Sequence, residues 1–217
     1  MRILLGTFVG LAALAGGAAG SGAKITRTFE EAQVGTPPSG FVFEVTRQTT
    51  SNQWVVQREG DNSFLVHLGS PVKGGGFALA LMEEQQHKNL AVAVRLRLAG
   101  GERSAGLVWH YRDAGNAYLA RLDLSEQKIG LYRFVRSNRI RIESKDDLEL
   151  DPNGWHVLKA VHEDDRIRVY LGGIKVFDAH DRTFPDSGGV GVWSSGESVT
   201  YFDDLRVEDR SERAGRP

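Results

Sequence analysis

The chain has 217 residues, a length at which an all-β protein commonly folds as one domain with a substantial core. Its 27 Lys and Arg residues nearly balance its 28 Asp and Glu residues, giving a formal net charge of −1. Because this charge is close to zero, the whole molecule has no electrostatic attraction to nucleic acid or to anionic membranes, and binding must come from a local site. The absence of cysteine excludes disulfide bonds and thiol catalysis.

The first 23 residues have the pattern of a signal peptide. Met1-Arg2 gives a short positive end, residues 3–14 are mainly apolar, and small residues fill 15–23. Three cleavage positions are open, after Ala15, Ala19 and Ala23. An uncleaved anchor is the alternative, but the apolar stretch is well short of the roughly 20 residues that span a bilayer. We therefore expect an exported protein, periplasmic or extracellular, with no stable membrane insertion after cleavage.

Beyond the signal peptide, the sequence predicts β-strands separated by short turns. Residues 78–86 are strong helix formers, yet their neighbours favour a strand through Met82 and then a loop, with a short helix as the alternative. Over 89–98 the apolar residues recur with a period of two, which a helix could not bury on one side. This apolar set is Leu90, Val92, Val94, Leu96 and Leu98.

Further strand-like segments follow in chain order to the end of the domain. They are residues 104–112, 118–124, 129–135, 140–144, 155–162, 167–171, 174–177, 189–193 and 199–207. Gly172-Gly173 predicts a two-residue hairpin turn with positive φ. So many short strands without a repeated βαβ unit predict an all-β fold, an antiparallel two-sheet β-sandwich or jelly roll. We expect this domain to span 24–208 and a flexible tail to span 209–217.

Several segments also carry a resemblance to a known family. The chain resembles the concanavalin A-like lectin/glucanase superfamily, in particular bacterial exported laminin-G-like domains, which are related in fold to family 16 glycoside hydrolases. The matching segments cover roughly residues 25–208 and are 105–113 (AGLVWHYRD), 116–121 (NAYLAR), 154–156 (GWH), 167–173 (IRVYLGG), 188–193 (GGVGVW) and 198–205 (SVTYFDDL). The resemblance implies two curved antiparallel sheets, with carbohydrate often bound at the concave face or on edge loops.

The same resemblance implies a structural calcium between the first and last strands, although no cofactor is required. Its ligands here would be Glu30, Asp203 and Asp204, because a hard cation needs several oxygen ligands and carboxylates supply the charge. The alternative is that Asp203-Asp204 is a solvated strand edge.

Known catalytic patterns fail in this sequence, so no catalytic residue is predicted. Family 16 hydrolases place two glutamates and an aspartate on one strand face, as Glu-x-Asp-x-(x)-Glu. The nearest match is Glu149-Leu150-Asp151, but Pro152 follows and the second glutamate is missing. His162-Glu163 begins like the metalloprotease motif His-Glu-x-x-His, but the fifth residue is Arg166.

The remaining constellation is a set of polar and aromatic residues on the polar faces of consecutive strands. If these strands are neighbours in one sheet, the side chains form a basic and aromatic patch suited to sugar hydroxyls, carboxylates and sugar rings. The candidate ligand-binding residues are Arg95, Arg97, His110, Arg112, Arg121, Asp123, Tyr132 and Arg133. The alternative is an ordinary solvated sheet face with cross-strand charge pairs.

The four tryptophans are the other candidates for sugar contacts. Trp54 and Trp193 could be sugar platforms, whereas Trp109 and Trp155 lie in line with apolar positions and are expected in the core.

Together these patterns favour an exported, non-catalytic binding module, with a glycan or polysaccharide as its partner and no role in nucleic-acid binding. A glycan-active hydrolase or lyase with a non-standard site and a structural domain of the cell envelope are the alternatives. The sequence does not specify the ligand or the oligomeric state.

Overall fold

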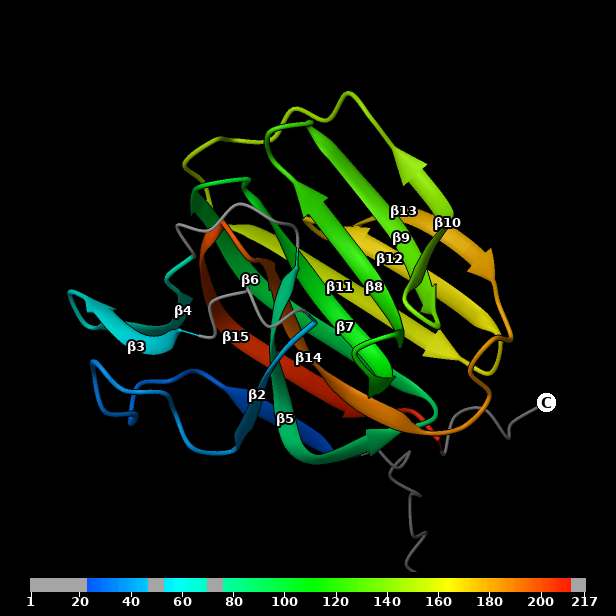
Figure 1. The fold of residues 1–217 in the computed structure, drawn as a ribbon, viewed down its shortest axis with the longest axis horizontal. Coiled ribbons are helices and arrows are strands. Elements are labelled where there is room, and N and C mark those ends of the chain that lie inside the picture. The colour runs from blue at the N-terminus through cyan, green and yellow to red at the C-terminus, as the bar shows by residue number, and fades with distance from the viewer. Residues whose placement is uncertain (1–22, 47–52, 70–75, 212–217) are drawn as a thin grey trace, which may run out of the picture.

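The computed structural model describes residues 23–46, 53–69 and 76–211, which form two antiparallel β-sheets packed face to face (Figure 1). The eight-stranded sheet contains, in spatial order, β13 (Ile174–His180), β12 (Arg166–Leu171), β11 (His156–Glu163), β6 (Leu90–Gly100), β15 (Val199–Asp209), β4 (Asn62–His67) and β3 (Trp54–Glu59), with β1 (Lys24–Arg27) beside β15. The seven-stranded sheet contains β10 (Asn138–Lys145), β9 (Lys128–Val135), β8 (Asn116–Asp123), β7 (Ser104–Asp113), β14 (Gly188–Ser195), β5 (Phe77–His87) and β2 (Phe41–Val45). The predicted all-β sandwich is confirmed.

The core lies between the two sheets and is built by the predicted alternation. On β6, the apolar set from Leu90 to Leu98 is buried at 1% exposure or less and belongs to the main hydrophobic cluster. From the other sheet, Leu107 and Trp109 of β7 and Tyr118 of β8 enter the same cluster. The inward-facing side chains of the two sheets therefore meet in one apolar layer between them.

The hairpin between β12 and β13 forms as predicted. Gly172 and Gly173 connect the two strands and have φ values of +57° and +84°, which glycine adopts without a steric cost.

The strand predicted to stop at Met82 continues to His87. The strand is irregular beyond Met82. Its register with β14 shifts between Gly189 and Gly191, and Glu84 has a φ of +56°. Gln86 and His87 then resume pairing with Gly189 and Gly188. The sheet hydrogen bonds offered by β14 therefore outweigh the helix propensity of this segment.

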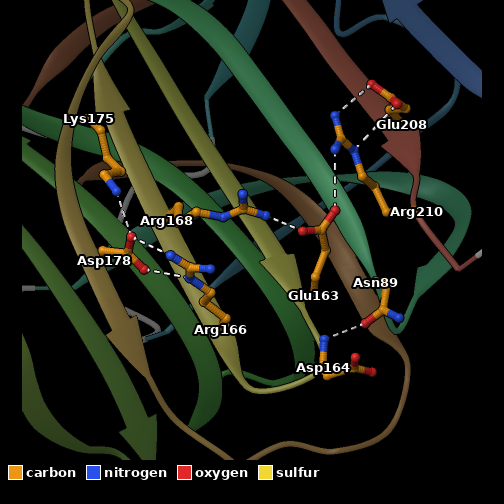
Figure 2. Close-up of polar contacts among 9 residues, drawn as sticks. All are labelled: Asn89, Glu163, Asp164, Arg166, Arg168, Lys175, Asp178, Glu208 and Arg210. Carbon is orange, nitrogen blue, oxygen red and sulfur yellow. Dashed lines mark hydrogen bonds and ion pairs between the residues drawn. The ribbon is translucent and has the colours of Figure 1, made fainter. Parts of the chain in front are cut away.

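Strand β15 ends one residue beyond the predicted domain boundary at residue 208. β15 includes Glu208 and Asp209, and the next residue, Arg210, pairs with Glu163 of β11 and with Glu208 (Figure 2). Arg210 therefore contacts the sandwich. The predicted signal peptide falls outside the described residues except for Ala23, as does the tail beyond residue 211. The described residues include no helix that could cross a membrane.

Candidate functional site

The two outer faces of the sandwich differ in chemistry. On the eight-stranded sheet, charged residues of β11, β12 and β13 neutralise one another: Arg166 and Lys175 share Asp178, while Glu163 lies between Arg168 and Arg210 (Figure 2). The seven-stranded sheet instead carries a second apolar cluster. Its members alternate along the strands with the core residues and so lie on the outer face; they are Leu79, Leu81, Val108, Tyr111, Ala117, Leu119 and Trp193.

The apolar outer face is concave. Phe77 of β5 and Phe134 of β9 meet edge to face, with ring centroids 5.6 Å apart. Their strands are four positions apart in the sheet, a separation of about 19 Å if the sheet were flat. The ring contact therefore requires the sheet to curl toward these two side chains.

The phenylalanine pair covers a tryptophan in the floor of this face. The Trp193 ring lies 4.7 Å from that of Phe77 and is 1% exposed. Its Nε1–H donates to the carbonyl of Ala120, 3.3 Å away on β8. Trp193 is on β14, so its indole crosses β7 to make this bond. The Trp193 ring is thus a structural floor and is not open to a ligand.

A pocket of about 400 Å³ opens beside the phenylalanine pair, and we call it the Arg121 pocket. It combines aromatic edges, small residues, hydroxyl groups and charged side chains. Its lining residues are Thr46, Gly76, Phe77, Glu102, Ser104, Ala114, Arg121, Phe134, Ser137, Arg139 and Ser195. A partly apolar hollow with a small number of polar groups that point into it is typical of small-molecule sites.

Arg121 is held in a fixed orientation in this pocket. Its Nε–H donates to Ser104 Oγ at 2.7 Å, and its Nη2 pairs with the buried carboxylate of Asp123. Asp123 is itself fixed, because its Oδ1 accepts the backbone N–H of Glu126 at 2.9 Å. Such pre-organisation lowers the entropy that a ligand must overcome when it engages the guanidinium.

Glu102 and Ser195 add hydrogen-bond acceptors to the pocket lining. The Ser195 hydroxyl donates to the Glu102 carboxylate, and Ser195 and Glu102 both line the hollow. The backbone N–H of Ser104 donates to Ser198 Oγ at 2.9 Å, which fixes the turn before β7.

Tyr132 forms the boundary toward the edge strand β10. A Cβ at Gly130 would collide with the Tyr132 ring, so the ring lies over the glycine. Gly130 is the register partner of Arg121, which brings Tyr132 close to the pocket. The Arg139 guanidinium lies 5.4 Å from the centroid of the Tyr132 ring and also lines the pocket.

Three of the predicted site residues therefore share this outer face: Arg121, Asp123 and Tyr132. Arg95 and Arg97 lie elsewhere, because β6 belongs to the eight-stranded sheet and is not a neighbour of β7. His110, Arg112 and Arg133 are on β7 and β9, but their side chains have partners away from this face. The single patch that the sequence predicted across all these strands does not form. The binding role of each residue stays a prediction.

Arg95 and Arg97 occupy the outer face of the eight-stranded sheet. The Arg97 guanidinium lies 4.4 Å from the centroid of the Tyr201 ring and 5.2 Å from that of Trp155, and it pairs with Glu59 at 2.7 Å. Arg95 lies 5.1 Å from the same Trp155 ring. Trp155 is half-buried on this outer face, so its predicted place in the core is wrong.

The remaining predicted residues lie at the other end of the sandwich. His110 is buried, with Nδ1 2.9 Å from the carbonyl of Phe184 and Nε2 2.9 Å from that of Lys88. Arg112 pairs with Asp186 at 3.0 Å, and Arg133 pairs with Asp181. These contacts account for the three residues structurally.

The predicted calcium ligands do not form a cation site. Both carboxylate oxygens of Glu30 lie 3.1 Å from the backbone N–H of Ser63. Asp203 accepts from Asn62 Nδ2 at 3.3 Å, and Asp203 and Asp204 each lie 3.4 Å from Arg95 Nη1. Burial raises the pKa of the Asp203 carboxyl, which disfavours the charged form that calcium needs. Within the described ranges, no group of three or more His, Cys, Asp or Glu residues could hold a metal ion.

Of the residues that line the pocket, sequence analysis found Arg121 and missed the others, among them Phe77, Glu102, Phe134, Arg139 and Ser195. A signal existed for Arg139, because Arg139 and Arg141 alternate with Ile140 and Ile142 in the second strand of a predicted hairpin. The role of Phe77 had no local signal, since it depends on contact with a strand four positions away.

No protein-family model matches the sequence. A levanase from Bacillus subtilis (strain 168) is 30% identical over 99 residues, which are 44% of this chain and 14% of the levanase. The chain therefore spans a small part of that relative's length.

Solved structures show the same fold at low sequence identity. A carbohydrate-binding module, CBM66 from Bacillus subtilis, has a TM-score of 0.62 and 21% identity over 82% of this chain and 99% of that chain. A GH43 protein, BlXynB from Bacillus licheniformis, has a TM-score of 0.58 and 20% identity over 85% of this chain and 39% of that one. A β-1,3-1,4-glucanase from a mouse hindgut metagenome has a TM-score of 0.55 and 12% identity over 86% and 98%. The chain is thus an antiparallel two-sheet β-sandwich with the concanavalin A-like jelly-roll fold.

Proposed function

We propose that this chain is an exported carbohydrate-binding module and that its ligand lies in the Arg121 pocket. The observation that carries the proposal is the pocket itself, in which a pre-organised arginine, three serines and a carboxylate surround a hollow next to two phenylalanine rings. Similarity to a carbohydrate-binding module and to part of a levanase supports a carbohydrate as the ligand class.

The chemistry of the pocket suits a sugar. Sugar hydroxyls both donate and accept hydrogen bonds, so they can use the guanidinium of Arg121, the hydroxyl of Ser104 and the carboxylate of Glu102. The apolar C–H face of a sugar ring can pack on Phe77 and Phe134. The pocket is partly open, as binding to one part of a larger polysaccharide requires.

Binding without catalysis is also proposed from the carboxylates. Glycoside hydrolases generally use two carboxyl groups that flank the scissile bond. Among the described residues that line the pocket, only Glu102 is acidic, and the nearby Asp123 is buried against Arg121. A glycan-active hydrolase or lyase with a site elsewhere is the second candidate, favoured only by the enzymes with this fold.

The test is a binding screen of the chain from Lys24 onward against immobilised polysaccharides that include levan and a β-1,3-1,4-glucan. We expect a defined ligand, and we expect Arg121→Ala to weaken its binding about 10-fold or more, because a charge-assisted hydrogen bond is lost. Arg166→Ala is the matched control, since Arg166 pairs with Asp178 on the opposite sheet. Release of reducing sugar would instead indicate an enzyme. A folded protein that binds no polysaccharide, or equal loss in both variants, would refute the proposal.

A further inference from the structure

The hairpin of β9 and β10 carries arginines with no acidic partner among the described residues. They are Arg136, Arg139 and Arg141, all exposed at the edge of the seven-stranded sheet. Most arginines elsewhere in the described ranges pair with a carboxylate, as Arg121, Arg166 and Arg168 do. The hairpin therefore presents positive charge that the protein does not neutralise itself.

Arg139 is the member of this group that lines the Arg121 pocket. Its guanidinium carbon lies over the Tyr132 ring, 5.4 Å from the centroid, and the Tyr132 ring lies over Gly130. A cation–π contact of this kind uses the face of the guanidinium, and its N–H groups can still donate two parallel hydrogen bonds to a planar anion such as a carboxylate. Arg139 is thus oriented by an aromatic ring while its hydrogen-bond donors remain unused by any described carboxylate.

The positive and negative side chains that line the pocket come from different segments of the chain. Arg139 lies on the edge strand β10, whereas Glu102 lies in the turn between β6 and β7 and accepts the Ser195 hydroxyl. Arg121 is neutralised by Asp123, so Arg139 is the uncompensated positive group of the lining. A ligand with one anionic side and one hydroxyl-rich side complements this arrangement.

We propose that the Arg121 pocket binds a glycan that carries carboxylate groups, such as a polymer of uronic acid, and that Arg139 binds the carboxylate. The proposal rests on the proposed function of the pocket and names its substrate class. Hydroxyl groups of the same sugar face Glu102 and Ser195, where a second carboxylate would be repelled. This assignment makes Arg139 the residue that distinguishes acidic glycans from neutral ones.

Charge on an edge strand also prevents pairing with another chain. That role needs only a solvated charge, so Lys at position 139 would serve it as well as Arg. A fork to a carboxylate needs the planar guanidinium, so the two roles differ in their response to Arg139→Lys.

The test uses polygalacturonate, alginate and hyaluronan, each beside its carboxyl-reduced form, in which the backbone is the same but the charge is gone. Calorimetric titration or affinity electrophoresis measures binding to the chain from Lys24 onward. We expect at least one native polymer to bind about 10-fold or more tightly than its reduced form. Arg139→Gln and Arg139→Lys should each remove that preference and leave binding to the reduced form unchanged.

Arg141→Gln is the matched control, because Arg141 is on the same strand and outside the pocket lining. It should change the affinity less than about twofold, an effect set by long-range charge alone. If a neutral polysaccharide binds in an Arg121-dependent way and no native polymer is preferred to its reduced form, the inference about carboxylates is overturned and the proposed function stands. If the folded chain binds none of the charged or neutral polymers, both are overturned.

Discussion

Acid should destabilise this sandwich through two histidines that lie stacked in its interior. The rings of His110 and His162 are 4.5 Å apart between centroids and only 13° from parallel, and each residue is 1% exposed. The Trp109 Nε1–H donates to His162 Nδ1 at 3.1 Å, so this ring is neutral and carries its proton on Nε2. A second proton on His162 would break the bond from Trp109 and place a charge in the core.

The size of the effect follows from the shifted pKa. Burial, together with the neighbouring His110, lowers the pKa of His162 to about 3 from its ordinary value of 6.5. In the unfolded chain His162 takes up a proton below about pH 6.5, whereas in the folded chain it does so only near pH 3. The stability that this group contributes is therefore complete above pH 6.5 and is lost progressively as the pH falls toward 3. At pH 5 the loss is about 2 kcal/mol.

The assay is urea unfolding of the wild-type chain and of His162→Gln at pH 7.5 and pH 5.0. Glutamine does not titrate, and its side-chain oxygen can accept the N–H of Trp109. We expect the free energy of unfolding to fall between the two pH values by about 2 kcal/mol less in the variant than in the wild type. His180→Gln is the control, because it makes the same substitution at an exposed histidine outside the core. An equal fall in wild type and His162→Gln would show that the core histidine is not the source of the acid sensitivity.

Two further predictions concern the floor and the support of the pocket. Asp123→Asn should weaken binding of the polysaccharide found in the screen about 10-fold, because an amide N–H₂ would face Arg121 and release it from its fixed position; unchanged affinity in calorimetric titration would argue against a pre-organised Arg121. Trp193→Phe should lower the free energy of unfolding by about 1–3 kcal/mol, since it removes buried volume and the bond to Ala120; urea denaturation measures this loss, and a neutral result would mean that the floor repacks.

The fold could be predicted because the alternation on each strand is local information. The run from Leu90 to Leu98 specifies both a strand and its buried face, and Gly172-Gly173 specifies a tight hairpin. The extension of β5 beyond Met82 could not be predicted from the local sequence pattern. It depends on hydrogen bonds to Gly188 and Gly189, which lie about a hundred residues further along the chain.

The candidate site could be predicted only in part, because alternation does not say which sheet a strand joins. Arg121, Asp123 and Tyr132 were found, since β8 and β9 are consecutive strands joined by a short turn. Arg95 and Arg97 were grouped with them wrongly, because β6 pairs with β11 and β15 and not with its sequence neighbour β7. Long-range pairing of this kind is decided by the whole core and leaves no mark in the local pattern.

The strands of the seven-stranded sheet are apolar on both faces, and this property explains how the site is built. Val108, Leu119 and Trp193 give the outer face a hydrophobic floor that would be costly to leave in water. Phe77 and Phe134 cover part of that floor by contacting each other across three intervening strands. A hollow opens beside the pair, and Arg121 and Arg139 line it. In the proposed function, the same pair of side chains that protects the outer face from water would confine the sugar to the hollow beside them, next to Arg121 and Arg139.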